Sequence, residues 1–464
     1  FREAKKSKDV KSAITSTLNR LSLPIFLTSI TTSAAFLTMI SSPITSMTGY
    51  GISIGFGILC AWILSCTMLP SLINLKKWNF SSAALSTPSL LEHVISLFSK
   101  KILNNPKSIL IYGIFIVLLS SVGIQYINVE VNLINLFKKQ NSIKESTLFL
   151  DKEMAGSMNL MMKVEGDLKD PDVLNQMIII QQYLENNPYI NNSISIANII
   201  QEMHKVIMDN NPKYYSIPDS RKKINNLFTM YSISGNPEDF ESLINYNYDT
   251  GLLTAMMHTV STRDVVHIVN DINSFLNSEQ IDLDIEISGL MIFLKDFVSL
   301  VIKSSINSII ISIFLILFIV RFFFKSWQLG LLAVLPLTSA IILNFGLMGW
   351  FGIDLTHFTA LLTSIIIGVG VDFAIHYISD FINYKKNKVD LEKISCDVVD
   401  NVGYPILLDV FSNMGFGALI FSSLIPLVHM GGLMLFAMIS TSLGTLTILA
   451  AIMEIYKHQF VIKV

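Results

Sequence analysis

Charged residues are scarce in this chain of 464 residues, because Asp, Glu, Lys and Arg together make up only 15% of it. Soluble domains carry about 25% charged residues. Hydrophobic residues contribute 51%, and the mean hydropathy is +0.55. The net charge of −2 leaves no basic excess for a nucleic acid, so we expect no nucleic-acid partner. This composition is typical of a protein whose main solvent is a membrane.

Cysteines are few as well. The three of them, Cys60, Cys66 and Cys396, lack the spacing of metal ligands, and the topology inferred below puts them in membrane or cytoplasmic segments. We therefore expect no disulfide framework, no bound metal and no cofactor. The chain begins at Phe1, without an initiator Met or a signal peptide ahead of its first apolar segment. We expect it to be a piece of a longer polypeptide.

Eight apolar runs are long enough to cross about 30 Å of hydrocarbon as helices. They predict two transmembrane helices within 23–70, one at 108–126, three within 300–380 and two within 404–455. The predicted cytoplasmic segments are a connection at 1–22, a linker at 71–107, an amphipathic helix at 381–403 and a tail at 456–464. Residues 127–299 lose the continuous apolar character and predict one water-exposed domain.

Basic residues indicate the orientation of these helices. The connections that we assign to the cytoplasm contain Lys5, Lys76, Lys100, Lys385 and many other basic residues, whereas the short connections near 42–47, 350–356 and 425–431 contain neither Lys nor Arg. Cytoplasmic loops carry an excess of Lys and Arg. The bias predicts a multi-pass protein of the cytoplasmic membrane with residues 127–299 on the extracytoplasmic side.

The water-exposed domain has both strand and helix patterns. We predict strands at 159–164, 193–196, 251–258 and 281–287, and helices at 171–185, 197–208 and 262–276. The expected fold class is a polytopic α-helical membrane protein with an extracytoplasmic α+β domain, built of small sheets that are each covered by two helices.

The chain contains an internal repeat. The nonapeptide from Pro24 to Thr32 (PIFLTSITT) aligns with the one from Pro405 to Asn413 (PILLDVFSN), and Ala35-Phe36 then aligns with Gly415-Phe416 after a gap of one residue. Lysine pairs, Lys5-Lys6 and Lys385-Lys386, precede the two copies. Because transporters are often duplicated, we expect upstream residues equivalent to 108–380, and twelve helices in the intact protein.

This layout resembles the resistance-nodulation-division superfamily. Gly352-Ile-Asp-Leu-Thr356 and Gly368-Val-Gly370-Val-Asp372-Phe373-Ala-Ile-His376 are similar to a helix motif of its MmpL-like exporter branch. The Ser422-Ser423 and Gly431-Gly432 pairs are also family-like. The branch usually has Tyr where this chain has Phe373, so a hydroxyl that would steady the carboxylate is missing. The resemblance implies a porter-like α+β domain, no enzymatic activity, and lipids or other hydrophobic molecules as cargo.

Intramembrane polar residues predict the functional site without the resemblance. A carboxylate near the bilayer centre costs about 2.5 to 3.5 kcal/mol even on the mildest insertion scale, so such residues are usually functional. We predict a proton relay in which Asp372 faces Ser412 and Asn413, and His376 faces Asp409. Gly368, Gly370 and Gly415 are predicted to allow close helix packing or bending. Asp380, Asp354, His357 and His429 lie at helix ends, where we expect solvated structural roles.

The hypothesis from these residues is export driven by the proton-motive force. Asp372 would take up a proton when its site is open to the outside and release it inward after its polar neighbours rearrange, with His376 relaying it toward Asp380. The partners would be protons, membrane lipids, a hydrophobic cargo, the missing half of the same protein and accessory proteins or an oligomer.

Two alternatives remain open. The first is a sterol-sensing, Patched-like receptor or a lipid-handling protein that does not pump, although the short, cysteine-free 127–299 domain is unlike such receptors. The second is an intramembrane aspartyl protease. Presenilin-like proteases place the catalytic Asp directly after Gly-x-Gly, whereas Val371 intervenes here and no Pro-Ala-Leu motif follows.

Overall fold

A computed structural model describes residues 9–75, 95, 104–234, 240–277, 281–386, 392 and 394–458. The lysine pair Lys5-Lys6, most of the predicted linker 71–107 and the end of the predicted tail 456–464 lie outside the described residues. The chain divides into two compact units. One comprises residues 1–128 and 300–464 and is called the membrane unit below. The other, Val129–Ser299, is called the α+β domain.

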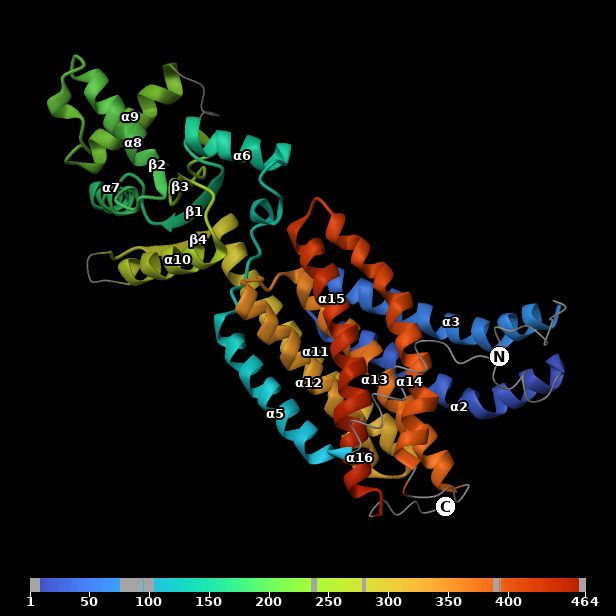
Figure 1. Cartoon of the computed structure of the whole chain (residues 1–464). Helices are drawn as coiled ribbons and strands as arrows, with labels where there is room; N and C mark the ends of the chain where they lie inside the picture. The colour runs from blue at the N-terminus through green and yellow to red at the C-terminus, as the bar shows by residue number, and fades with distance from the viewer. Residues whose placement is uncertain are drawn as a thin grey trace. The chain divides into compact units, whose positions relative to one another are not determined.

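The described residues contain eight helices that are long and apolar enough to cross a membrane, which confirms the predicted fold class (Figure 1). The first three spans consist of α2 (Val10–Leu37) with the 3-10 segment η1 (Thr38–Ser41), α3 (Thr45–Leu75), and α5 (Pro106–Gly123) with the 3-10 segment η3 (Ile124–Tyr126). The next three are α11 (Leu290–Phe324), α12 (Trp327–Phe351) and α13 (His357–Lys386). The last two are α14 (Ile394–Asn413) with the 3-10 segment η7 (Met414–Phe421), and α15 (Ile425–Gly444) with the π-helical segment η8 (Thr445–Leu449) and α16 (Ala450–Tyr456).

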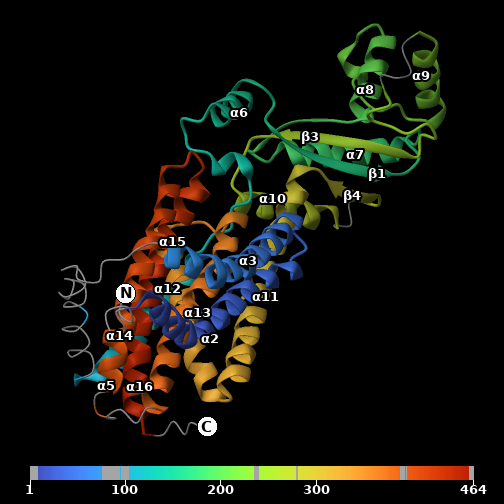
Figure 2. The same cartoon turned by 90° about the vertical axis from the view of Figure 1, so that its right-hand side faces the viewer.

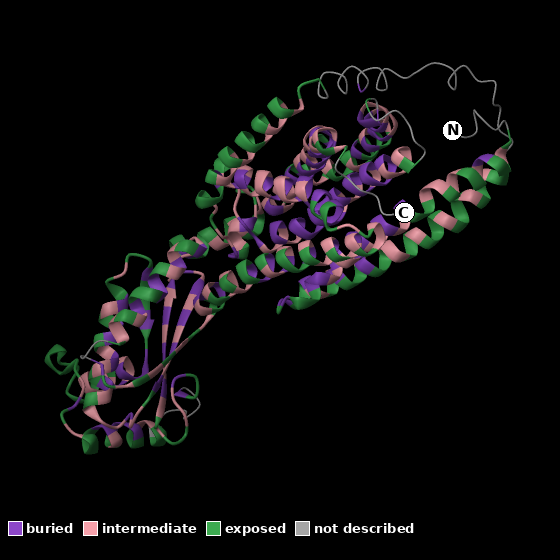
Figure 3. Ribbon diagram, turned by 90° about the horizontal axis from the view of Figure 1, so that it is seen from below, coloured by how far each residue is buried: buried purple, intermediate pink, exposed green. Residues whose placement is uncertain are grey.

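Helix α13 lies at the centre of the membrane unit, between α2, α12, α14 and α15. Of its most apolar window 78% is buried, against 6% for the corresponding windows of α3 and α5. Buried residues are accordingly concentrated inside the bundle and exposed apolar residues on its outer helices (Figure 3). A polar residue on α13 is therefore shielded from lipid by neighbouring helices, the position that intramembrane polar groups favour.

Glycines allow α5 and α12 to approach closely. A Cβ atom built on Gly346 would lie 2.1 Å from the Ser120 carbonyl oxygen, and one built on Gly349 would lie 1.7 Å from the Gly123 carbonyl oxygen. Neither position has room for any side chain. Helices in membranes commonly pack through such small residues because backbones can then come into contact.

The α+β domain contains one four-stranded antiparallel sheet with the order β2-β3-β1-β4, and Figure 2 shows β3, β1 and β4 of this sheet. Its strands are β1 (Met158–Glu165), β2 (Ile190–Ile194), β3 (Thr250–Met257) and β4 (Asp284–Ser288). Helix α7 (Pro171–Glu185) joins β1 to β2, and α10 (Thr262–Leu276) joins β3 to β4. This order and connectivity are those of the split βαβ, or ferredoxin-like, motif. The sequence prediction of several small sheets is therefore wrong, since a single sheet contains all the named strands of the described residues.

The core of this sheet follows from alternation along the strands. Leu160, Met162 and Val164 of β1 are fully buried, and the residues between them are half-buried. The apolar stripe of α7, which includes Met177, is buried as well, and α7 contacts β2 and β3. Helices α7 and α10 lie side by side, with the rings of Tyr183 and Phe275 stacked at 3.8 Å.

The remaining elements of the α+β domain precede β1 or lie between β2 and β3. They are the 3-10 segments η4 (Leu133–Leu136) and η5 (Pro212–Tyr214) and the helices α6 (Ser142–Glu153), α8 (Ile196–Ile207) and α9 (Arg221–Ser234). Helix α8 matches the predicted helix at 197–208. The sequence analysis did not predict α6 or α9.

Candidate functional site

Polar residues recur along one face of α13. Asp372, His376 and Asp380 follow one another at intervals of four residues, about one helical turn each. Asp372 and His376 are half-buried, and Asp380 is only 9% exposed. Asp380 therefore does not have the solvated position that we expected for it.

Asp372 is hydrogen-bonded to α2. The Thr32 hydroxyl lies 3.1 Å from Asp372 Oδ1 and 2.9 Å from the Gly368 carbonyl oxygen, and it is the donor to both. Thr32 is itself buried. The predicted contacts of Asp372 with Ser412 and Asn413 are absent from the hydrogen bonds of the described residues.

Asp409 and Asn413 form a separate pair on α14. Asn413 lies one helical turn after Asp409, and its amide group is close enough to interact with the Asp409 carboxyl group. Asp409 and Ser412 are exposed, and Asn413 is half-buried. Two of the predicted relay residues, Asp409 and Asn413, are therefore neighbours on one helix. Among the described residues, no hydrogen bond joins Ser412 to an acidic group of α13.

A cavity of about 540 Å³ lies between these helices, and we call it the acidic cavity. It lies in the membrane unit and is lined by α2, α13 and α14. Its titratable and amide lining groups are Arg20, Asp372, His376, Asp380, Asn401, Tyr404 and Asp409. His376 and Asp409 face this cavity together, as predicted for a relay, but no hydrogen bond joins them in the described part of the chain.

Asp380 joins three helices at one end of the acidic cavity. Its carboxylate accepts hydrogen bonds from Arg20 Nη2 of α2 at 3.2 and 3.3 Å and from the Asn401 side chain of α14. The sequence analysis assigned Arg20 only to a cytoplasmic connection and did not consider Asn401. The signal that could have identified them is their alignment in the repeat, where Arg20 corresponds to Asn401.

The hydrogen-bond partners of the acidic groups of α13 lie on the two helices that carry the internal repeat. Helices α2 and α14 carry the aligned copies and both pack against α13. Thr32 of α2 corresponds to Asn413 of α14, and Arg20 corresponds to Asn401. We predicted that Asp372 contacts the polar face of the second copy, on α14. In the structure it is hydrogen-bonded to the equivalent face of the first copy, on α2.

The predicted packing glycines differ in their surroundings. A Cβ on Gly368 would lie 2.7 Å from Thr32 Cγ2, and one on Gly370 would lie 2.9 Å from Thr441 Cγ2. Both positions therefore require a small residue for the observed packing. Gly415 has no heavy atom within 4 Å of such a Cβ, so no close helix contact is present there. It lies instead in the 3-10 segment η7.

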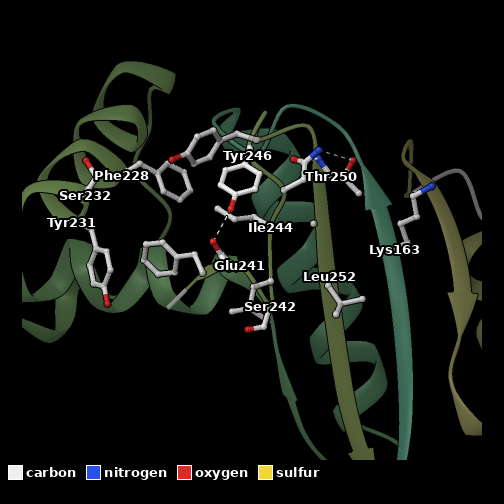
Figure 4. A pocket seen from close by; sticks show the side chains of 15 residues that line it. Lys163, Phe228, Tyr231, Ser232, Glu241, Ser242, Ile244, Tyr246, Thr250 and Leu252 are labelled. Carbon is white, nitrogen blue, oxygen red and sulfur yellow. Dashed lines mark hydrogen bonds between the residues drawn. The ribbon is translucent and has the colours of Figure 1, made fainter. Parts of the chain in front are cut away.

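A second cavity, of about 550 Å³, lies in the α+β domain between α9 and β3 (Figure 4). We call it the aromatic pocket, because Phe228, Tyr231, Phe240, Tyr246 and Tyr248 line it. The Tyr246 hydroxyl donates to the Glu241 carboxylate at 2.7 Å. No cargo-binding residues of this domain were predicted from the sequence, although the five aromatic residues within 228–248 could have indicated an apolar pocket.

Comparisons with known proteins agree with these features. Residues 1–88 match the family model described as the MMPL family. A protein of Methanocaldococcus jannaschii that is named only as a membrane protein is 22% identical over 299 residues, which cover 63% of this chain and 73% of that protein.

The fold also matches a solved structure. The hedgehog release protein Disp from the water bear Hypsibius dujardini superposes with a TM-score of 0.68 and 15% identity. The match covers 97% of this chain and 60% of that one, so the chain spans less than two thirds of the solved protein. The predicted resemblance to an MMPL-like family is thus confirmed for residues 1–88, and the fold of the chain is similar to that of Disp.

Proposed function

We propose that this protein moves lipids or other hydrophobic molecules across or out of the cytoplasmic membrane, and that inward proton movement through Asp372 drives the transport. The carboxyl group of Asp372 carries this proposal. It lies on the central helix of the membrane unit, where its hydrogen bond to Thr32 and its place in the acidic cavity give it one polar partner and one open side.

The energetics support a working role for this carboxyl group. A charged group within the membrane is costly, and such residues usually mark ion pathways or proton relays. One proton moving inward supplies about 2.3 kcal/mol per 100 mV of membrane potential. This energy becomes available each time Asp372 takes up a proton on one side and releases it on the other. His376 and Asp409 line the same cavity and are the candidate relay groups.

The proposed activity is transport without covalent chemistry. A protease dyad would need two carboxyl groups around one water, whereas the hydrogen bond described for Asp372 leads to Thr32, and Asp409 lies one helical turn from Asn413 on α14. The aromatic pocket of the α+β domain is a concave apolar surface that suits a hydrophobic cargo. We propose that this domain lies on the extracytoplasmic side.

Substitution of Asp372 by Asn tests the proposal, because Asn preserves the shape of the side chain and cannot carry a proton. The full-length protein would be reconstituted in vesicles of phosphatidylethanolamine and phosphatidylglycerol, with a fluorescent phospholipid as the probe cargo and an imposed pH gradient. We expect lipid movement to be lost in Asp372→Asn and retained in Asp354→Asn, which removes an acid outside the acidic cavity. Gradient-driven movement by Asp372→Asn at the wild-type rate would contradict the proposal.

A second candidate function is favoured by the solved structure with the same fold. Its name describes release of a protein, and a fold can host several functions. Release of a membrane-attached molecule, or a sterol-sensing role like that of Patched, would not require a proton gradient. Cargo movement that persists after the gradient is collapsed would favour this candidate over the pump.

A further inference from the structure

The ion pair between Arg20 and Asp380 lies two helical turns beyond Asp372 along α13. Arg20 Nη2 contacts both carboxylate oxygens, and the Asn401 side chain provides a further donor from α14. The Asp380 side chain is only 12% exposed, whereas that of Arg20 is 37% exposed. The carboxylate is therefore more deeply buried in the bundle than the arginine side chain that pairs with it.

Stability alone is a weak reason for this arrangement. Desolvation offsets much of the attraction within a buried ion pair, and well-packed apolar residues are often at least as stabilising. The best-attested use of a buried pair is to select one of two arrangements. Here the pair connects α2, which carries the first copy of the repeat, to α13, which packs against both copies.

The position of the pair determines what it can select. Arg20, Asp380 and Asn401 line the same cavity as Asp372 and His376, at the end of α13 that leads to Lys386. Arg20 and Asn401 are aligned residues of the two copies, so Asp380 receives a donor from the same position of each. If the copies move apart, the carboxylate can lose the Arg20 donor and keep the Asn401 donor.

We propose that Arg20 and Asp380 are positioning residues of the proton site, and that their ion pair closes this end of the acidic cavity. A proton leaves Asp372 through this end only while the pair is broken. The inference rests on the proposed function, because it requires Asp372 to be the group that exchanges protons. In this proposal Asp380 controls whether protons can leave the cavity, whereas the sequence predicted that it accepts the proton from His376.

Proton leak through the full-length protein tests this inference without any cargo. The protein would be reconstituted in vesicles of phosphatidylethanolamine and phosphatidylglycerol that contain a pH-sensitive dye, and a potassium diffusion potential would drive protons inward. We expect Arg20→Gln and Asp380→Asn to raise the leak by about fivefold, the change in an open population that corresponds to about 1 kcal/mol. Arg20→Lys retains the charge and should raise the leak less.

Two controls separate gating from general damage. The Lys457–Glu454 pair is also shielded, with side chains 12% and 18% exposed, but both members lie at one end of the last span. Lys457→Gln should therefore leave the leak unchanged. The charge-reversed double variant Arg20→Asp/Asp380→Arg can re-form the pair, and we expect its leak to return toward the wild-type value.

The outcomes distinguish this inference from the proposed function. A wild-type leak in monodisperse Arg20→Gln protein would overturn the gate, even if Asp372→Asn abolishes transport. A raised leak that disappears in Arg20→Gln/Asp372→Asn supports both. If the raised leak persists in that double variant, the protons bypass Asp372 and the inference is overturned. Retained transport by the single variant Asp372→Asn would instead overturn the proposed function.

Discussion

The hydroxyl group of Thr32 should set the pH at which the proton site works. Thr32→Val removes the donor to Asp372 Oδ1 and keeps nearly the same volume, so the packing against Gly368 is preserved. A hydrogen bond to a charged group contributes about 1.5–3 kcal/mol. The single hydroxyl hydrogen is shared between the carboxylate at 3.1 Å and the Gly368 carbonyl oxygen at 2.9 Å.

Because of this sharing, we assign about half of the usual contribution to the carboxylate, roughly 1 kcal/mol. Since a change of one pH unit in a proton equilibrium corresponds to about 1.4 kcal/mol, the pH midpoint of proton flux should rise by about 0.5 to 1 unit in Thr32→Val. The direction follows because the lost hydrogen bond favours the anion. Flux into dye-loaded vesicles would be measured as a function of pH.

Thr31 offers a matched control for this measurement. It is fully buried on the same helix, but its hydroxyl donates to the carbonyl oxygens of Leu27 and Thr28 within α2. Thr31→Val should therefore leave the pH midpoint unchanged, and Thr32→Ser should restore the wild-type midpoint. Coincident profiles for Thr32→Val and wild type would refute the assignment of Thr32 as the partner of Asp372.

Three further predictions follow from packing and charge. Gly346→Ala should lower the stability of the membrane unit by about 1–3 kcal/mol, because its Cβ would overlap the backbone of α5, and thermal unfolding in detergent would measure this. Met177→Ala should destabilise the α+β domain by about 2–5 kcal/mol, since Met177 is fully buried, and hydrogen exchange on the full chain should show faster exchange in α7. The hydrogen bond from Arg221 lowers the pKa of Asp167 from its ordinary value of 3.8. The Arg221–Asp167 ion pair therefore stabilises the folded domain at pH values above the unfolded-state pKa of Asp167, and this stabilisation is lost as the pH falls through the folded-state pKa. Arg221→Ala should therefore speed hydrogen exchange slightly at pH 7 and have no effect at a pH below both values; an equal effect at both pH values would contradict the ion-pair explanation.

The helices that the sequence predicts best are those with clear start signals. Helices 171–185 and 262–276 are observed with the predicted bounds. Asp170 caps the first by accepting from the Asp172 amide, and Ser261 caps the second by accepting from the Asp264 amide. Helix α9 follows Ser220, whose hydroxyl accepts from the Lys223 amide at 3.5 Å, but its first turn reads Arg-Lys-Lys and its apolar residues are sparse. Its formation depends on tertiary contacts, which include the edge-to-face packing of Phe228 on Phe240.

The membrane spans were predictable because hydrocarbon requires long apolar helices. The partners of Asp372 were not, because the repeat offers the same polar face twice. Thr32 and Asn413 are aligned, and spacing along the chain gives no reason to prefer one. Only the packing of α2 on α13 decides in favour of Thr32. The ion pair of Asp380 was not predicted either, because Arg20 is 360 residues away in sequence and only the packing of α2 on α13 brings the two together.

The 3-10 segment η7 bears on how the two copies of the repeat could diverge in length. Between the aligned motifs, the second copy has one residue fewer: Met414 stands where the first copy has Ser33 and Ala34. A 3-10 helix rises about 2.0 Å per residue and an α-helix about 1.5 Å. The eight residues of η7 thus extend about 4 Å further than they would as α-helix. This extra rise exceeds the roughly 1.5 Å that one α-helical residue would add, so the tighter winding compensates in length for the one residue by which the second copy is shorter between the motifs.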